Sequence, residues 1–227
     1  MRKPIILISG EDGIDAGGGA NFVIRKAYVD AVEKAGGIPV VALDVRTAAV
    51  YASQTDALIL TDGPNLHPSR YGEIIQDFKD LKNYSRTRDE LDFHLLAEFV
   101  KAGKPVLGIG RGAAVINAFR GGTVGYYKDD ENPKANLQTI NIKAGSFLKK
   151  IYGSKSLQNR FQKFSINKLG KGLKKSAVSQ GGEIEAIEDN KDHIYAVLFN
   201  PEKELGEVKT GNEIFEFFIE KALEVAG

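Results

Sequence analysis

The sequence contains no cysteine, carries almost no net charge and has only three histidines. Without cysteine the chain can form no disulfide, no thiolate metal site and no thiolate nucleophile. The 31 basic and 30 acidic residues leave a formal net charge of +1. This balance gives no electrostatic reason to expect nucleic acid or an anionic membrane as a partner. His67, His94 and His193 do not cluster along the chain, so no metal site is expected.

Long apolar runs are also lacking. The run Ile5–Ile8 follows the basic residues Arg2 and Lys3 and is stopped by Ser9 and Gly10. It is too short for a signal-peptide core or a membrane span, and it is typical of a buried first strand. We therefore expect a cytoplasmic protein. The length of 227 residues, with no repeat or linker-like stretch, predicts a single domain over residues 1–227.

The first half of the chain alternates strand-like apolar runs with helical patterns. We expect strands at 5–8, 38–43, 57–60 and 105–109, helices at 22–35 and 90–102, and a glycine-rich loop at 10–19. Near-continuous apolar strands separated by helices indicate a parallel sheet covered on both faces. The prediction is an α/β three-layer sandwich with a mostly parallel central sheet and its pocket at the carboxyl ends of the strands.

The second half is more polar than the first. Residues 124–136 are polar and predict an exposed loop, and residues 137–142 alternate polar and apolar positions as a half-buried strand does. Later strands are expected at 183–187 and 194–199. A closing helix is expected over 213–225.

Residues 104–123 read KPVLGIGRGAAVINAFRGGT, a strand that runs into a tight turn and then a helix. This is the geometry of a nucleophile elbow, which holds one side chain exposed above a sheet. The stretch resembles the Pro-x-Leu-Gly-Ile-Cys-Arg-Gly…Gly-Gly-Thr/Ser signature of class I glutamine amidotransferase-like hydrolases of the γ-glutamyl-γ-aminobutyrate hydrolase type. Gly110 stands where that family has its catalytic cysteine.

The resemblance extends along nearly the whole chain. Residues 35–39, 68–73 and 145–148 are similar to family segments in the same order. Residues 196–202 resemble Gly-Val-Gln-Trp-His-Pro-Glu, so Asn200 stands at the catalytic histidine and Glu202 at the carboxylate that orients it. The resemblance implies the class I glutamine amidotransferase-like, flavodoxin-like fold.

A further segment, residues 158–169, is similar to the family's Val-Asn-Ser-x-His-His-Gln-x-Ile-x-x-Leu. The two histidines and the glutamine are replaced by Gln162, Lys163 and Phe164. In the family this segment borders the substrate pocket. The replacements therefore concern the substrate as well as the chemistry.

The family reaction needs a thiolate, a histidine that accepts and returns a proton, and a group that orients the histidine. Gly110 has no side chain, and the amide of Asn200 cannot take up a proton near neutral pH. Loss of one triad member costs comparable hydrolases up to about a millionfold. We predict a catalytically inactive homologue, without a cofactor, that binds a small amino-acid-like ligand or serves a protein partner as a regulatory subunit. Homo-oligomer formation stays open. The alternative is a γ-glutamyl amide hydrolase or amidotransferase with a non-cysteine mechanism.

The expected binding residues surround the elbow. Gly63 and the backbone N–H of Arg111 correspond to the family's oxyanion-hole side, and the start of a helix near Arg111 favours anions. Gly112, Gln162 and Lys163 complete the expected ligand contacts. For the Arg111 side chain, an ion pair with Glu73 or Glu202 is an equal alternative.

Three local expectations complete the prediction. Gly110 should adopt a positive φ, with Asn200 and Glu202 facing it across one cleft. The glycines 17–19 lack the Gly-Lys-Ser/Thr ending of a phosphate loop and are expected to form a flexible rim. His67 is expected to be a solvated turn histidine.

Overall fold

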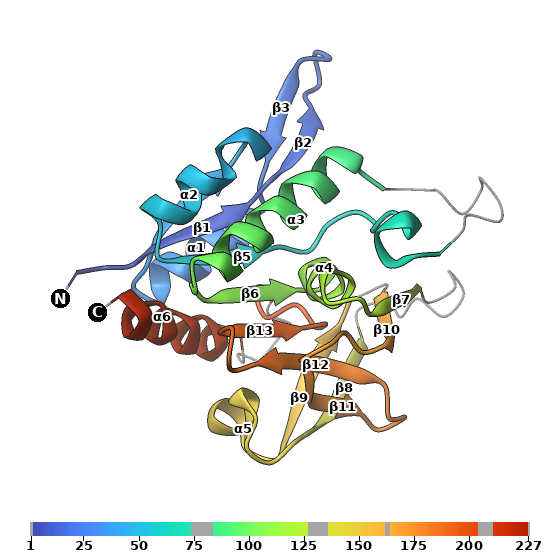
Figure 1. Cartoon of the computed structure of the whole chain (residues 1–227). Helices are drawn as coiled ribbons and strands as arrows, with labels where there is room; N and C mark the ends of the chain where they lie inside the picture. The colour runs from blue at the N-terminus through green and yellow to red at the C-terminus, as the bar shows by residue number, and fades with distance from the viewer. Residues whose placement is uncertain (1, 74–83, 127–135, 162–163, 204–210, 227) are drawn as a thin grey trace.

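A twisted sheet forms the centre of the molecule (Figure 1), and it has nine strands. The computed structural model describes residues 2–73, 84–126, 136–161, 164–203 and 211–226. The strand order is β4-β1-β5-β6-β13-β12-β11-β8-β9. These strands are β1 (Ile5–Ser9), β4 (Ile38–Ala42), β5 (Ala57–Leu60), β6 (Val106–Ile109), β8 (Asn136–Ile142), β9 (Lys155–Arg160), β11 (Lys174–Ser179), β12 (Ile184–Asp189) and β13 (Ile194–Val197).

The sheet has a parallel and an antiparallel part. Neighbours from β4 through β1, β5 and β6 to β13 pair in parallel. Neighbours from β13 through β12, β11 and β8 to β9 pair antiparallel. The α/β sandwich with its mostly parallel central sheet is therefore confirmed, and the antiparallel strands extend one end of it.

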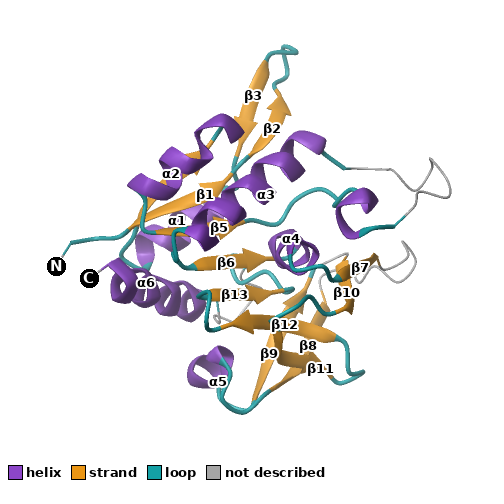
Figure 2. Cartoon of the chain, viewed as in Figure 1, coloured by secondary structure: helices purple, strands orange, loops and turns teal. Residues whose placement is uncertain are grey.

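Helices cover both faces of the sheet (Figure 2). One face carries α2 (Ala48–Gln54), α3 (Arg86–Lys101) and α4 (Arg111–Phe119), and the other carries α1 (Lys26–Lys34), α5 (Phe147–Tyr152) and α6 (Asn212–Ala226). Successive strand side chains point to opposite faces. In β5, Leu58 and Leu60 pack with the first group of helices, and Ala57 and Ile59 pack with the second. Burial on both faces explains why the parallel strands are apolar at consecutive positions.

The glycine-rich stretch after β1 is not the expected loop. It folds as an antiparallel hairpin of β2 (Glu11–Ile14) and β3 (Ala20–Val23), which projects from the body in Figure 1. The side chain of Asp15 accepts hydrogen bonds from the N–H groups of Gly17 and Gly19, both at 2.8 Å. An Asp that binds the backbone two and four residues ahead stabilises a tight turn, so the glycines lie in the turn of a hairpin where a loop was predicted.

Two other boundaries differ from the prediction. The first helix begins at Lys26 rather than at residue 22, because the preceding residues belong to the hairpin. The stretch expected as a loop from residue 124 begins inside β7 (Thr123–Tyr126), which pairs with β10 (Phe164–Lys168). Residues 127–135 lie outside the described part. No helix within the described ranges is long and apolar enough to cross a membrane.

Candidate functional site at the strand-to-helix turn

Gly110 forms the turn between β6 and α4. Its φ of 54° and ψ of −109° confirm the expected positive φ, a conformation that glycine adopts without a Cβ penalty. Its N–H donates to the carbonyl oxygen of Val197 at 2.9 Å. The turn therefore lies where the neighbouring parallel strands β6 and β13 both end.

Asn200 and Glu202 lie together beyond the end of β13. Asn200 is fully buried, and its Nδ2 donates to Glu202 Oε1 at 3.0 Å. Asn159 on β9 holds the backbone on both sides of this residue. Its Oδ1 accepts from Asn200 N at 2.9 Å, and its Nδ2 donates to Asn200 O at 2.7 Å. The expected pairing of residues 200 and 202 is thus present, with an amide in place of an imidazole.

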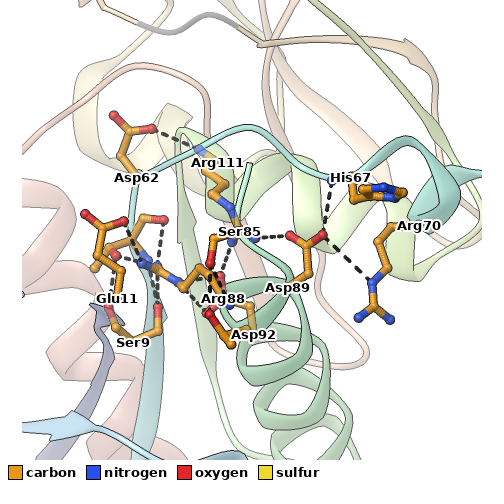
Figure 3. Close-up of polar contacts among 12 residues, drawn as sticks. Ser9, Glu11, Asp62, His67, Arg70, Ser85, Arg88, Asp89, Asp92 and Arg111 are labelled. Atoms are coloured by element: carbon orange, nitrogen blue, oxygen red, sulfur yellow. Dashed lines mark hydrogen bonds and ion pairs between the residues drawn. The ribbon is translucent and has the colours of Figure 1, made fainter. Parts of the chain in front are cut away.

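Asp62, in the loop after β5, links Gly110 to Asn200 and was missed as a site residue in the sequence. An ideal Cβ on Gly110 would lie 2.5 Å from Asp62 Oδ1. Asp62 Oδ1 accepts from the N–H of Arg111 at 3.2 Å, and Asp62 Oδ2 accepts from Asn200 Nδ2 at 3.1 Å (Figure 3 shows the first of these bonds). The carboxylate of Asp62 therefore fills the space into which an elbow side chain would point. An acidic residue two positions after the end of a buried parallel strand was the signal that could have identified it.

Two cations and a tyrosine surround this carboxylate. Arg25 Nη1 and Lys203 Nζ each lie 3.5 Å from Asp62 Oδ2. The hydroxyl oxygen of Tyr28 accepts from the Asp62 N–H at 3.0 Å. Lys203 also lies 4.7 Å above the ring of Phe161. The site therefore combines two acidic side chains, Asp62 and Glu202, with two basic ones.

Burial shifts the titration of two groups in the site. It raises the pKa of Glu202, and the nearby Asp62 carboxylate adds to the rise. Burial also raises the pKa of Tyr28 well above its usual value, followed by the charges of Glu202 and Asp62. Asn200 Oδ1 and Glu202 Oε2 are buried without a hydrogen-bond partner. An unpaired buried acceptor is costly, and it favours a donor from a bound molecule.

The guanidinium of Arg111 points away from this site. It forms ion pairs with Asp89 and Asp92 on α3, as Figure 3 shows, and it is fully buried. The expected partners Glu73 and Glu202 were wrong, because the two aspartates one turn apart on α3 face the start of α4. Only the backbone N–H of Arg111 faces Asp62.

A second arginine completes a buried ion cluster, defined as Arg88, Asp89, Asp92 and Arg111. Arg88 Nε lies 3.0 Å from Asp92 Oδ1, and Arg88 Nη2 donates to Ser9 Oγ at 2.9 Å and to Thr61 Oγ1 at 2.6 Å. This arginine therefore joins α3 to the carboxyl ends of β1 and β5. The formal charges of the two arginines and two aspartates in the buried ion cluster cancel.

His67 borders the same cluster. The backbone N–H of His67 donates to Asp89 Oδ2 at 3.1 Å, and its ring Nδ1 lies 2.7 Å from Ser69 Oγ. The side chain is buried, so the expectation of a solvated turn histidine was wrong. The hydrogen bond to Asp89 thus holds the loop around His67 against the ion cluster.

The remaining predicted binding residues have different surroundings. Gly63 lies beside the cluster, where a Cβ would be 3.3 Å from Glu11 Oε2 and 3.4 Å from Arg111 Cδ. A Cβ on Gly112 would overlap the carbonyl oxygen of Leu60, so this glycine lets α4 approach β5. Gln162 and Lys163 lie outside the described residues. In the described ranges, no group of three or more acidic or histidine side chains could hold a metal ion.

Comparisons with known proteins agree with this architecture. Residues 10–202 match the peptidase C26 family. A candidate glutamine amidotransferase of Schizosaccharomyces pombe is 30% identical over 206 residues, covering 86% of this chain and 81% of the relative. Protein NtpR of Enterococcus hirae is 27% identical over 240 residues, covering 96% and 99%. The crystal structure of a candidate GMP synthase subunit from Thermoplasma acidophilum shares the fold, with a TM-score of 0.70 at 16% identity over 100% of this chain and 98% of that one. The chain therefore belongs to the peptidase C26 family of glutamine amidotransferase-like proteins.

Proposed function

We propose that this protein is a catalytically inactive homologue of the γ-glutamyl-γ-aminobutyrate hydrolase type, which binds a small amino-acid-like ligand or acts as a regulatory subunit. One observation carries the proposal. Asp62 Oδ1 lies 2.5 Å from the position of a Cβ on Gly110, so a carboxylate fills the space of the missing nucleophile.

The chemistry of amide hydrolysis opposes such an arrangement. The tetrahedral intermediate carries a negative oxygen, which amidohydrolases stabilise with preorganised N–H donors. Here the N–H of Arg111 already donates to Asp62 at 3.2 Å. A second anion at this donor would meet the negative charge of Asp62 at short range. The Asn200 amide can neither take the proton of a nucleophile nor give one to the leaving amine.

One observation favours a second candidate, a γ-glutamyl amide hydrolase or amidotransferase with a non-cysteine mechanism. Asp62 places a carboxylate at the point where the elbow presents its nucleophile, and carboxylates serve as nucleophiles in other enzyme classes. Under this candidate, Asp62→Asn abolishes turnover, because an amide is not a nucleophile of comparable strength.

The test is ammonia release from glutamine and from γ-glutamyl amides by the purified protein. We expect no release above a heat-denatured sample. Turnover that resists thiol reagents and disappears in Asp62→Asn contradicts the inactive assignment and supports the second candidate. Turnover that resists thiol reagents and persists in Asp62→Asn also contradicts the inactive assignment, and it assigns the chemistry to a group other than Asp62.

Reconstruction of the catalytic groups tests how much of the site is left. Gly110→Cys with Asn200→His restores a thiol and a base, but the new side chain at position 110 collides with Asp62. We expect alkylation of this cysteine only when Asp62→Gly is added, with an unperturbed thiol pKa of about 8.5 as the reference for its rate. Because residues 162–164 also differ from the family, we expect small alkylators to react and glutamyl analogues not to. Labelling by a glutamyl electrophile in the triple variant means that the family substrate still binds.

A further inference from the structure

We infer that Asp62 is the built-in occupant of a carboxylate-binding site and sets its specificity: the site excludes a free carboxylate while Asp62 is present and accepts the carboxylate group of a small acid when this side chain is removed. The inference rests on the proposed function in one respect, namely that the site does not hydrolyse amides, and it places any amino-acid-like ligand of the unmodified protein away from these donors. Its evidence is the set of donors around Asp62.

Four donors converge on this carboxylate from separate parts of the chain. The N–H of Arg111 binds Oδ1 at 3.2 Å, and Asn200 Nδ2 binds Oδ2 at 3.1 Å. Lys203 Nζ and Arg25 Nη1 each lie 3.5 Å from Oδ2. Arg111 begins the nine-residue helix α4, whose N-terminus favours negative charge. Each oxygen of the anion is thus recognised separately.

The neutral side-chain donor in this set, Asn200 Nδ2, is fixed in direction. Asn200 is fully buried, and its Nδ2 is shared between Asp62 Oδ2 and Glu202 Oε1, which leaves Oδ1 without a partner. Asn159 holds the backbone of Asn200 from both sides. The donor therefore keeps its place when Asp62 is removed, and the free oxygen can accept from a ligand that carries an N–H group next to its carboxylate.

The ligand class follows from the occupant itself. The side chain of Asp62 ends in the same CH₂–COO⁻ group as acetate, and 12% of it is exposed, so solvent reaches the anion. Removal of Asp62 takes the carboxylate partner from both Arg25 and Lys203, and Glu202 stays close enough to Lys203 to interact with its charge. A free acid competes poorly in the unmodified protein until its concentration exceeds the effective concentration of the tethered carboxylate, which is of millimolar order or more.

The experiment is calorimetric titration of sodium acetate and of L-glutamate, at ionic strength held constant with sodium chloride. The proteins are the unmodified chain, Asp62→Ala, Asp62→Ala with Asn200→Ala, and the surface control Asp30→Ala. We expect saturable binding in Asp62→Ala alone. The added Asn200→Ala should weaken it about 10- to 100-fold, which corresponds to one lost hydrogen bond to a charged group.

Two results overturn the inference. One is a folded Asp62→Ala protein, judged by circular dichroism, that shows no saturable binding of either acid. The other is equal binding by the unmodified chain or by Asp30→Ala. If Asp62→Ala does not fold, Asp62→Ser provides a small neutral side chain for the same titration. Ammonia release by the unmodified protein would refute the proposed inactivity while leaving these binding results independent of it.

Discussion

Arg111 divides two regions of opposite character. Below it, the buried ion cluster pairs its guanidinium with Asp89 and Asp92. Above it, its backbone N–H meets Asp62 in a site where Asn200 Oδ1 and Glu202 Oε2 have no partner. In the lower region two arginines pair with two aspartates. These contacts hold α3 against α4 and against the ends of β1 and β5. The upper region offers two buried acceptors without partners to a bound molecule, whereas the unpaired buried atom of the lower region is a donor, Arg111 Nε.

The largest effect should come from breaking the lower region. In Asp92→Ala, Arg88 and Arg111 both lose a buried carboxylate partner, and we expect the free energy of unfolding to fall by about 3–5 kcal/mol. Urea denaturation measures this. The surface pair of Asp30 with Lys26 is the control, because Asp30→Ala should cost about 1 kcal/mol or less. Equal losses in the two variants would remove the contrast between the regions.

A smaller effect should follow from the glycine that lies between the regions. In Gly112→Ala the new methyl group overlaps Leu60 O and forces α4 away from β5, at an expected cost of about 1–3 kcal/mol. Gly181→Ala is the matched control, because its nearest neighbour is Ser179 Oγ at 3.6 Å. Thermal unfolding of both variants decides the point. A neutral Gly112→Ala would mean that the elbow tolerates a looser helix.

A double-mutant cycle tests whether Asp62 and Gly110 are coupled. Gly110→Ala meets Asp62 Oδ1 and also adopts a strained φ, and only the first of these costs disappears in an Asp62→Gly background. We expect a coupling free energy of about 0.5–3 kcal/mol between the two changes. Additive losses would show that the carboxylate moves aside freely, and they would weaken the view that it blocks the elbow.

The smallest expected effect is a pH dependence of stability from Glu202. Burial raises its pKa in the folded state, so the folded protein binds this proton more tightly than the unfolded chain does. The free energy of unfolding therefore decreases as pH rises above the unfolded value of about 4.3. Glu202→Gln removes this titration, so its stability relative to the unmodified protein should increase with pH through that window. The exposed Glu220→Gln should show no such trend, and a flat difference for Glu202→Gln would contradict the expectation.

Much of the fold could be predicted because its signals are local. The apolar runs of β1, β5 and β6 predict buried strands, and the glycine at the elbow predicts a tight turn, each from a few neighbouring residues. The hairpin of β2 and β3 escaped prediction because glycine-rich turns and loops share the same composition, and only the hydrogen bonds of Asp15 decide between them. The polar strand β9 offered no apolar run for the pattern to detect.

The sequence by itself determined that the chain has no thiol, that a glycine occupies the elbow, and that Asn200 follows the last parallel strand. Only the tertiary structure decided that Asp62 fills the vacant space and that Arg111 turns its charge towards Asp89 and Asp92. These contacts join residues 49 and 138 positions apart in the chain, as in Asp62 with Arg111 and with Asn200. No local pattern encodes such pairs, because the sheet order brings the carboxyl ends of β5, β6 and β13 to one edge.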